Sequence, residues 1–150
     1  MAEKNDEKYR AYKLAHDRMN AALEKGFPLE VITIAESVIT DRLISHANFH
    51  GEGLNPHSAA LGPALNRFKR YPGKVDPTRH KDLVARIDAW RDKRNQTIHG
   101  IAKSDQGEGP TIAAEDFVEK ARAVAESGME LMTSLKSWHA AELKAANKQQ

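Results

Sequence analysis

The sequence "RDKRNQTIHG", residues 91–100, closes a segment with the pattern of an amphipathic helix. Successive helical residues are rotated by about 100°, so Trp90, Arg94 and Ile98 share one stripe. Arg94 is therefore a permanent charge among apolar neighbours. A charge in such a place is normally paired or lines a cleft, because an isolated buried charge costs several kcal/mol. The stretch therefore predicts a helix that ends at Gly100 and a site in which Arg94 is paired with an acidic group or lines a cleft.

The same 3.6-residue period recurs along the chain, and no clear period-2 segment bounded by turns predicts a strand. We therefore expect an all-α fold, an antiparallel bundle of four main helices plus a short helix. The expected helices cover about 3–25, 28–45, 58–68, 78–99 and 117–143. The whole chain, 1–150, is expected to form a single domain in which about 1–7 and 144–150 fray.

The last helix carries one continuous apolar seam, with steps of 4 and 3 residues. Its members are Phe117, Ala121, Val124, Gly128, Leu131, Leu135 and Trp138. Gly128 predicts a close approach by another helix, although glycine weakens a helix by about 1 kcal/mol relative to alanine. The next step would reach Glu142, so the seam stops at Trp138. Sequence alone leaves open whether the seam serves the bundle core or a partner helix.

Composition excludes several classes of protein. A chain of 150 residues can bury roughly 70% of its unfolded surface, enough for a true core. No apolar run approaches the ~18 residues that span a membrane, and the charged N-terminus does not resemble a signal peptide. Cysteine is absent, which removes disulfides, thiolate metal sites and a cysteine nucleophile. We expect a cytoplasmic protein with no membrane contact.

Charge is unevenly distributed. Residues 67–103 contain eleven Lys or Arg and four Asp, while the chain as a whole carries only +2. A basic block in an otherwise acidic chain is the footprint of a surface that meets phosphate. A solvated face is the alternative explanation.

The second helix contains a charge that matches Arg94. Glu36 shares the buried side of this helix with Ile32 and Ile39. A glutamate and an arginine on two helices can pair across a bundle. The alternatives are a purely structural ion pair, or an arginine that reaches solvent with its head group.

His99 adds a titratable group to this segment. Asn95 and His99 are four residues apart on one helical face, and a histidine at a helix end can serve as general acid or base. Arg94, with Lys93 and Lys103, could hold a phosphate. RNA supplies its own nucleophile, the 2′-OH, so such a site needs a base, a cation and alignment, but no metal.

The segment 94–99, Arg-Asn-Gln-Thr-Ile-His, resembles the R-x(4–6)-H signature of the HEPN superfamily. The segment "ALGPALNRF" is similar to a Leu-Gly segment that several HEPN groups carry before that helix. The resemblance implies an all-α bundle and a metal-independent endoribonuclease, often a toxin or phage-defence effector, that dimerises so that two motifs share one basic cleft. His99 lacks the His-x-Tyr continuation of toxins that are paired with a nucleotidyltransferase antitoxin.

The resemblance also implies roles for residues. Arg94 and His99 would be the catalytic pair and Asn95 a polar supporter, with an acidic residue from an earlier helix, Glu36 first and Asp41 second. We expect the basic block to bind RNA through Arg91, Lys93, Lys103, Arg67 and Arg70. The implied partners are RNA, a second copy of the chain, and an antitoxin or regulatory protein. No cofactor and no metal are expected.

Two other functional classes stay open at this stage. One is a catalytically inert HEPN-like module that binds RNA or nucleotides, and the other is a helical interaction module in which Arg94 and Glu36 are structural. A separate alternative concerns His46, His50 and His57, which fall with Glu52 in a predicted loop. They could bind zinc, but polar loop residues are the simpler explanation.

Overall fold

The computed structural model describes residues 2–100, 104–105, 109–110 and 114–148. Over these residues the helices are α1 (Ala2–Glu24), α2 (Pro28–Phe49), α3 (Leu61–Phe68), α4 (Pro77–Gly100) and α5 (Ala114–Lys148). The predicted all-α class is confirmed. The predicted loop after Gly100 contains two short strands, β1 (Ser104–Asp105) and β2 (Gly109–Pro110), which pair antiparallel. Two residues are too few to show an alternating pattern.

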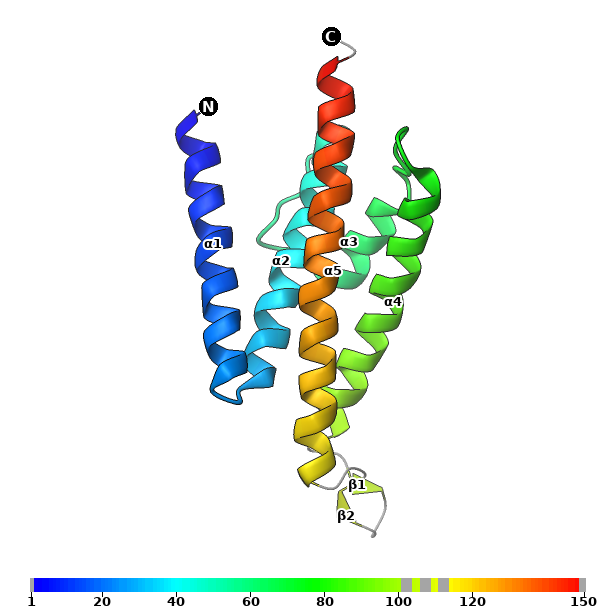
Figure 1. Ribbon diagram of the computed structural model, residues 1–150. Coiled ribbons are helices and arrows are strands. Elements are labelled where there is room, and N and C mark those ends of the chain that lie inside the picture. The colour runs from blue at the N-terminus through cyan, green and yellow to red at the C-terminus, as the bar shows by residue number, and fades with distance from the viewer. Residues whose placement is uncertain (1, 101–103, 106–108, 111–113, 149–150) are drawn as a thin grey trace.

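Four long helices lie side by side and alternate in direction (Figure 1). Helix α5 packs against both α2 and α4, whereas α1 packs mainly against α2 at the edge of the bundle. The short helix α3 contacts α2 and α4. The two termini lie at one end of the bundle, and the β1–β2 hairpin lies at the other. None of the described helices is long and apolar enough to cross a membrane.

The predicted helix starts are close, but the ends of α2 and α5 differ. Gly26, at φ +79°, and Pro28 separate α1 from α2 as predicted. Helix α2 continues to Phe49 instead of stopping near residue 45, because His46 and Ala47 are fully buried and packing extends the helix. Helix α5 continues to Lys148 through alanines and lysines, which favour helix. Helix α5 therefore includes residues 144–148 and α1 is already helical at Ala2, so both helices extend into the segments that were predicted to fray.

The seam of α5 lies inside this chain's own core. All of its members are buried, together with Ile39 and Leu43 of α2 and Ile87 of α4. The structure thus assigns the seam to the bundle core.

Gly128 makes the close approach that the seam predicted. A Cβ added there would lie 2.9 Å from Trp90 Cζ2 and 3.2 Å from Ala35 Cβ. Trp90 is held in place, since its Nε1 donates a hydrogen bond to the carbonyl oxygen of Val124 at 2.9 Å. Helices α2, α4 and α5 meet at this point, and α4 is thereby anchored just before Arg94.

Candidate functional site

Arg94 of α4 pairs with Glu36 of α2. Its Nη2 donates a hydrogen bond to Glu36 Oε2, and its Nη1 donates to Oδ1 of the adjacent Asn95. The side chains of Arg94 and Glu36 are each 24% exposed, so the pair lies near the surface without being freely solvated. The ion pair that the helical period predicted is therefore present.

One buried donor of the Arg94 guanidinium, the Nε, has no acceptor among the described residues. A guanidinium has five N–H donors and stays charged at any ordinary pH, and a buried donor without an acceptor costs about 1–3 kcal/mol. The Arg94 guanidinium therefore has more N–H donors than Glu36 and Asn95 engage.

His99 lies on another side of α4 from Arg94. It is an exposed residue in the last turn, one position before the helix ends at Gly100. Five helical residues correspond to a rotation of about 140°, whereas the four from Asn95 to His99 correspond to about 40°. Asn95 and His99 thus share a face as predicted, and Arg94 leaves α4 about 140° around the helix from His99.

Glu36 and Asp41 line one groove of about 800 Å³, formed by α1, α2 and residues 56–61, with His57 also on its wall. Asp41 accepts a hydrogen bond from the Tyr12 hydroxyl and lies 3.3 Å from Lys8 Nζ. Burial, and then the bond to Asp41, raise the pKa of the Tyr12 phenol well above its usual value. The two candidate carboxylates therefore lie in one groove, but Asp41 is already paired with Tyr12 and Lys8 of α1.

The predicted RNA-binding residues on α4 lie close to the motif. Arg91 pairs with Asp88 at 3.3 Å, and its guanidinium packs against Gly62 of the "ALGPALNRF" segment, where an added Cβ would lie 3.5 Å from Cζ. Lys93 is exposed one residue before Arg94. Lys103 lies outside the described residues.

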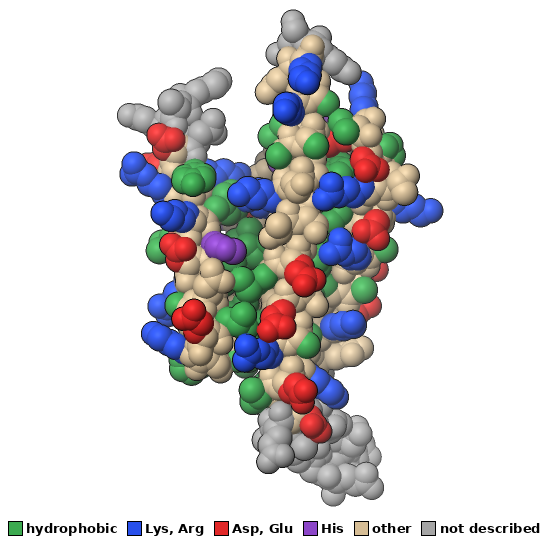
Figure 2. Space-filling model, in the orientation of Figure 1, with side chains coloured by type: hydrophobic (Ala, Val, Ile, Leu, Met, Phe, Trp, Pro, Cys, Tyr) green, Lys and Arg blue, Asp and Glu red, His purple; other side chains and the backbone are tan. Residues whose placement is uncertain are grey.

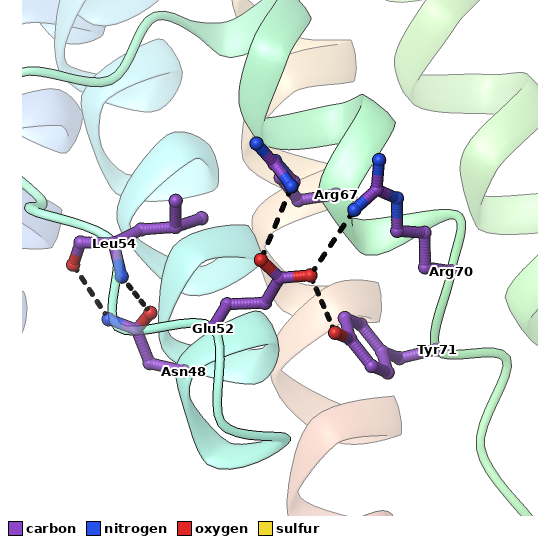
Figure 3. Close-up of polar contacts among 6 residues, drawn as sticks. All are labelled: Asn48, Glu52, Leu54, Arg67, Arg70 and Tyr71. Carbon is purple, nitrogen blue, oxygen red and sulfur yellow. Dashed lines mark hydrogen bonds and ion pairs between the residues drawn. The ribbon is translucent and has the colours of Figure 1, made fainter.

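Arg67 and Arg70 belong to a separate cluster around Glu52 (Figure 3). Glu52 accepts a hydrogen bond from the Tyr71 hydroxyl at 2.6 Å and lies 3.3 Å from Arg67 Nη1 and 3.6 Å from Arg70 Nη1. The Tyr71 bond, and then the two arginine charges, lower the pKa of the Glu52 carboxyl. In the sequence Glu52 stands only beside the loop histidines, and no pattern there predicts this cluster.

This cluster is far from Arg94. The end of α3 lies beside the start of α4, because His80 Nε2 donates a hydrogen bond to the carbonyl oxygen of Phe68 at 3.0 Å. From His80 to Arg94 the rise along α4 is about 20 Å. The structure therefore does not bring Arg67 and Arg70 together with Arg94.

His46, His50 and His57 do not meet at one point. His46 lies within α2, where it is fully buried, and its Nε2 donates to the carbonyl oxygen of Tyr71 at 3.0 Å. Its Nδ1 is then an acceptor 3.2 Å from His139 Nδ1. Burial lowers the pKa of His46 to about 4, partly offset by the Tyr71 bond.

The zinc alternative has no geometric support. Both ring nitrogens of His46 are engaged within the protein, and His57 lines the groove that contains Glu36. Over the part of the chain that the structure describes, no three His, Asp or Glu side chains are grouped so as to hold a metal ion. The prediction of a loop at His46 is wrong because tertiary packing extends α2.

Comparisons of the chain with protein-family profiles, with curated proteins and with solved structures gave no match. The site is therefore described from its own chemistry. Within a turn and a half of α4 it offers a fixed cation, a primary amide and an exposed imidazole, with one carboxylate from α2.

Proposed function

We propose that the protein is a metal-independent endoribonuclease of the HEPN type. The observation that carries the proposal is the Arg94–Glu36 hydrogen bond, which joins the R-x4-H segment to an acidic residue of an earlier helix. Asn95 is bonded to the same guanidinium, and His99 is exposed at the helix end. These are the residues and the relative positions that the resemblance implies for such a site.

The reaction would use the nucleophile that RNA carries. The 2′-oxygen attacks the adjacent phosphorus, the bond from phosphorus to the 5′-oxygen breaks, and a 2′,3′-cyclic phosphate and a 5′-hydroxyl result. His99 takes the 2′-hydroxyl proton or protonates the leaving 5′-oxygen, and Arg94 offsets charge on the phosphoryl oxygens. In such a scheme Glu36 and Asn95 orient the guanidinium.

A homodimer fits this arrangement. Arg94 and His99 diverge by about 140° around α4, so one chain directs them to different sides. Two copies that face each other could present an arginine and a histidine to one phosphate from opposite chains. We expect sedimentation at micromolar concentration to give twice the 16.7 kDa chain mass. A species of the single-chain mass would contradict this part of the proposal.

The cellular role that goes with this activity is that of a cytoplasmic toxin or phage-defence effector, which an antitoxin or regulatory protein keeps inactive.

The cleavage activity itself is tested directly. A labelled RNA should be cut in excess EDTA to fragments that end in a 2′,3′-cyclic phosphate, and a 2′-O-methylated RNA should stay intact. His99→Ala should abolish cleavage without changing the melting temperature, because His99 is exposed. Arg94→Lys should lower cleavage strongly, since lysine lacks the planar fork.

Gln96→Ala is the matched control, because Gln96 is exposed on the same turn of α4 and has no role in the scheme. It should cleave like the parent. Undiminished cleavage by His99→Ala, cutting of DNA at the same position, or activity lost in EDTA and restored by Mg²⁺ would each contradict the proposal.

One observation favours a second candidate, a catalytically inert HEPN-like module for RNA or nucleotide binding or for helix interaction. Two of the three guanidinium nitrogens of Arg94 are engaged by the protein itself, as expected of a structural ion pair. A protein that binds RNA with a salt-dependent affinity but never cleaves it would support this candidate.

A further inference from the structure

A second groove, of about 580 Å³, lies between α1 and α5. It exists because α1 packs on α2 and barely touches α5. Figure 2 shows the hollow between these two helices, with hydrophobic side chains at its base and both basic and acidic side chains along the helices that border it. Its lining comes from three helices. Helix α1 contributes Lys8, Tyr9, Tyr12, Lys13 and His16. Helix α2 contributes Val38 and Arg42, and α5 contributes Met132, Thr133 and Lys136.

The lining of this groove is one-sided in charge. It includes Lys8, Lys13, Arg42 and Lys136 and no carboxylate. Among the described residues, neither Lys13 nor Lys136 forms an ion pair. Clefts lined by one sign of charge focus the field and concentrate ions of the opposite sign. The ligand that suits these walls is therefore an anion.

Arg42 strengthens this conclusion at the base of the groove. Its guanidinium carbon lies 4.1 Å from the centroid of the Tyr12 ring, and its buried Nε has no hydrogen-bond partner within the described part of the chain. Asp41, which precedes Arg42 on α2, is bonded to Tyr12 and pairs with Lys8 at 3.3 Å. Lys8 is thus partly neutralised, while Lys13, Lys136 and Arg42 keep their charge for a ligand.

Tyr9 supplies an aromatic surface at the rim. It is 67% exposed, so its ring is accessible to a ligand in the groove. Lysines beside an exposed tyrosine are the combination that binds a phosphate and stacks a base, and stacking on an aromatic side chain tolerates any base. The volume also falls in the range of about 300–1,000 Å³ that is typical of small-ligand pockets.

We propose that the α1–α5 groove binds a nucleotide unit, with Lys13, Lys136 and Arg42 on its phosphates and Tyr9 against its base. This site is separate from Arg94 and His99, although it shares Lys8, Tyr12 and Val38 with the neighbouring groove that contains Glu36. It does not depend on the ribonuclease proposal, because binding needs no cleavage.

The test uses the full chain and ligands that cannot be cleaved. Fluorescence anisotropy would measure binding of a 2′-O-methylated oligoadenylate, with ATP and inorganic tripolyphosphate as competitors. Lys13→Ala/Lys136→Ala should weaken binding and lower the slope of log K against log salt by about 1.4, near 0.7 for each lost phosphate contact. Tyr9→Ala should lose at least about fivefold in affinity, and Tyr9→Phe should keep it, because stacking needs only the ring.

Lys120→Ala/Lys144→Ala is the matched control. It removes the same charge from exposed positions of α5 and should bind like the parent. Circular dichroism of each variant would show that the fold is kept. ATP that competes when tripolyphosphate does so poorly identifies a mononucleotide. Competition by the unlabelled oligonucleotide, with none by either ATP or tripolyphosphate, identifies a strand of nucleic acid, and both results support the site.

Four results would overturn the proposal. They are equal loss in the two double variants, equal competition by tripolyphosphate and ATP, unchanged binding by Tyr9→Ala, and no binding of any ligand by the parent at millimolar concentration. Since His99→Ala leaves the groove intact, it should bind like the parent, so failure of this site and failure of the cleavage proposal are separate outcomes.

Discussion

At the scale of single residues, Arg94 and Gly128 break the pattern of their helices, and in both cases the neighbours explain why. Arg94 interrupts an apolar stripe and is bonded to Glu36 of another helix. Gly128 interrupts a seam of larger side chains and lies against Trp90. Spacing alone predicted that another helix approaches Gly128 and that Arg94 could pair with Glu36, because helical rotation fixes which residues share a face.

Gly128→Ala should destabilise the protein. Alanine would gain about 1 kcal/mol in helix propensity, but overpacking typically costs about 1–3 kcal/mol. The overpacking should win, since the new methyl group would lie 2.9 Å from a tryptophan that is fixed by a hydrogen bond. Urea unfolding should show a net loss of about 1 kcal/mol in the free energy of unfolding.

Ser127→Ala is the control, because Ser127 precedes Gly128 on α5 and is exposed. Its free energy of unfolding should stay within about 0.5 kcal/mol of the parent's. A Gly128→Ala variant more stable than the parent would show that the bundle yields easily at this crossing.

At the scale of elements, the end of α5 holds the loop between α3 and α4. Glu142 is the first position beyond the apolar seam of α5. Its carboxylate accepts hydrogen bonds from the backbone N–H of Lys74 at 3.2 Å and of Val75 at 2.9 Å. Gly73 beside them has φ +77°, and an added Cβ would overlap Glu142 Oε1. Gly73 therefore both makes the turn and leaves room for the carboxylate.

Glu142→Ala should loosen this loop. It leaves two backbone donors with water as their partner, and since both bonds are exposed we expect a loss of only about 1 kcal/mol in the free energy of unfolding. Amide hydrogen exchange at Lys74 and Val75 should become faster. Glu130→Ala, on the exposed face of the same helix, should change neither quantity. Unchanged exchange in Glu142→Ala would mean that the carboxylate does not hold the loop in solution.

At the scale of the whole molecule, buried imidazoles make stability depend on pH. His46, His80 and His139 come from three helices, and burial is the first cause that lowers the pKa of each. The His46 ring packs edge-on against Trp138, with centroids 4.8 Å apart. These histidines are therefore neutral members of the packed interior when the protein is folded at neutral pH.

Stability should fall as the pH drops from about 6.5 towards 4. An unfolded histidine has a pKa near 6.5, whereas folded His46 has a pKa of about 4. Between these values the unfolded chain binds the proton and the folded chain does not, so acid favours unfolding. The contribution of His46 is complete above pH 6.5 and is lost on approach to pH 4, with a slope of up to about 1.4 kcal/mol per pH unit.

Urea unfolding between pH 5 and 7 would measure this slope. His46→Gln keeps a donor for the Tyr71 carbonyl but cannot titrate, and it should flatten the curve. His57→Gln should leave the slope unchanged, since His57 is exposed. Parallel curves for the parent and His46→Gln would show that His46 takes up its proton without unfolding the protein.

The helices, the seam of α5 and the inward placement of Arg94 and Glu36 could be predicted from the amino-acid sequence. The reason is that each of these follows from rotation within one helix: 3.6 residues per turn decide which side chains face inward, and two inward charges on different helices must find partners. The close approach at Gly128 follows in the same way.

Contacts between segments that are far apart in the sequence depend on the tertiary structure. Packing from other elements extends α2 through His46, and the pairing of Glu52 with Arg67 and Arg70 depends on where a loop folds back. The α1–α5 groove likewise depends on where α1 rests, since Tyr12 lies against Arg42 only because α1 packs on α2. No helical periodicity relates the residues that form such contacts, so the local sequence pattern does not predict them.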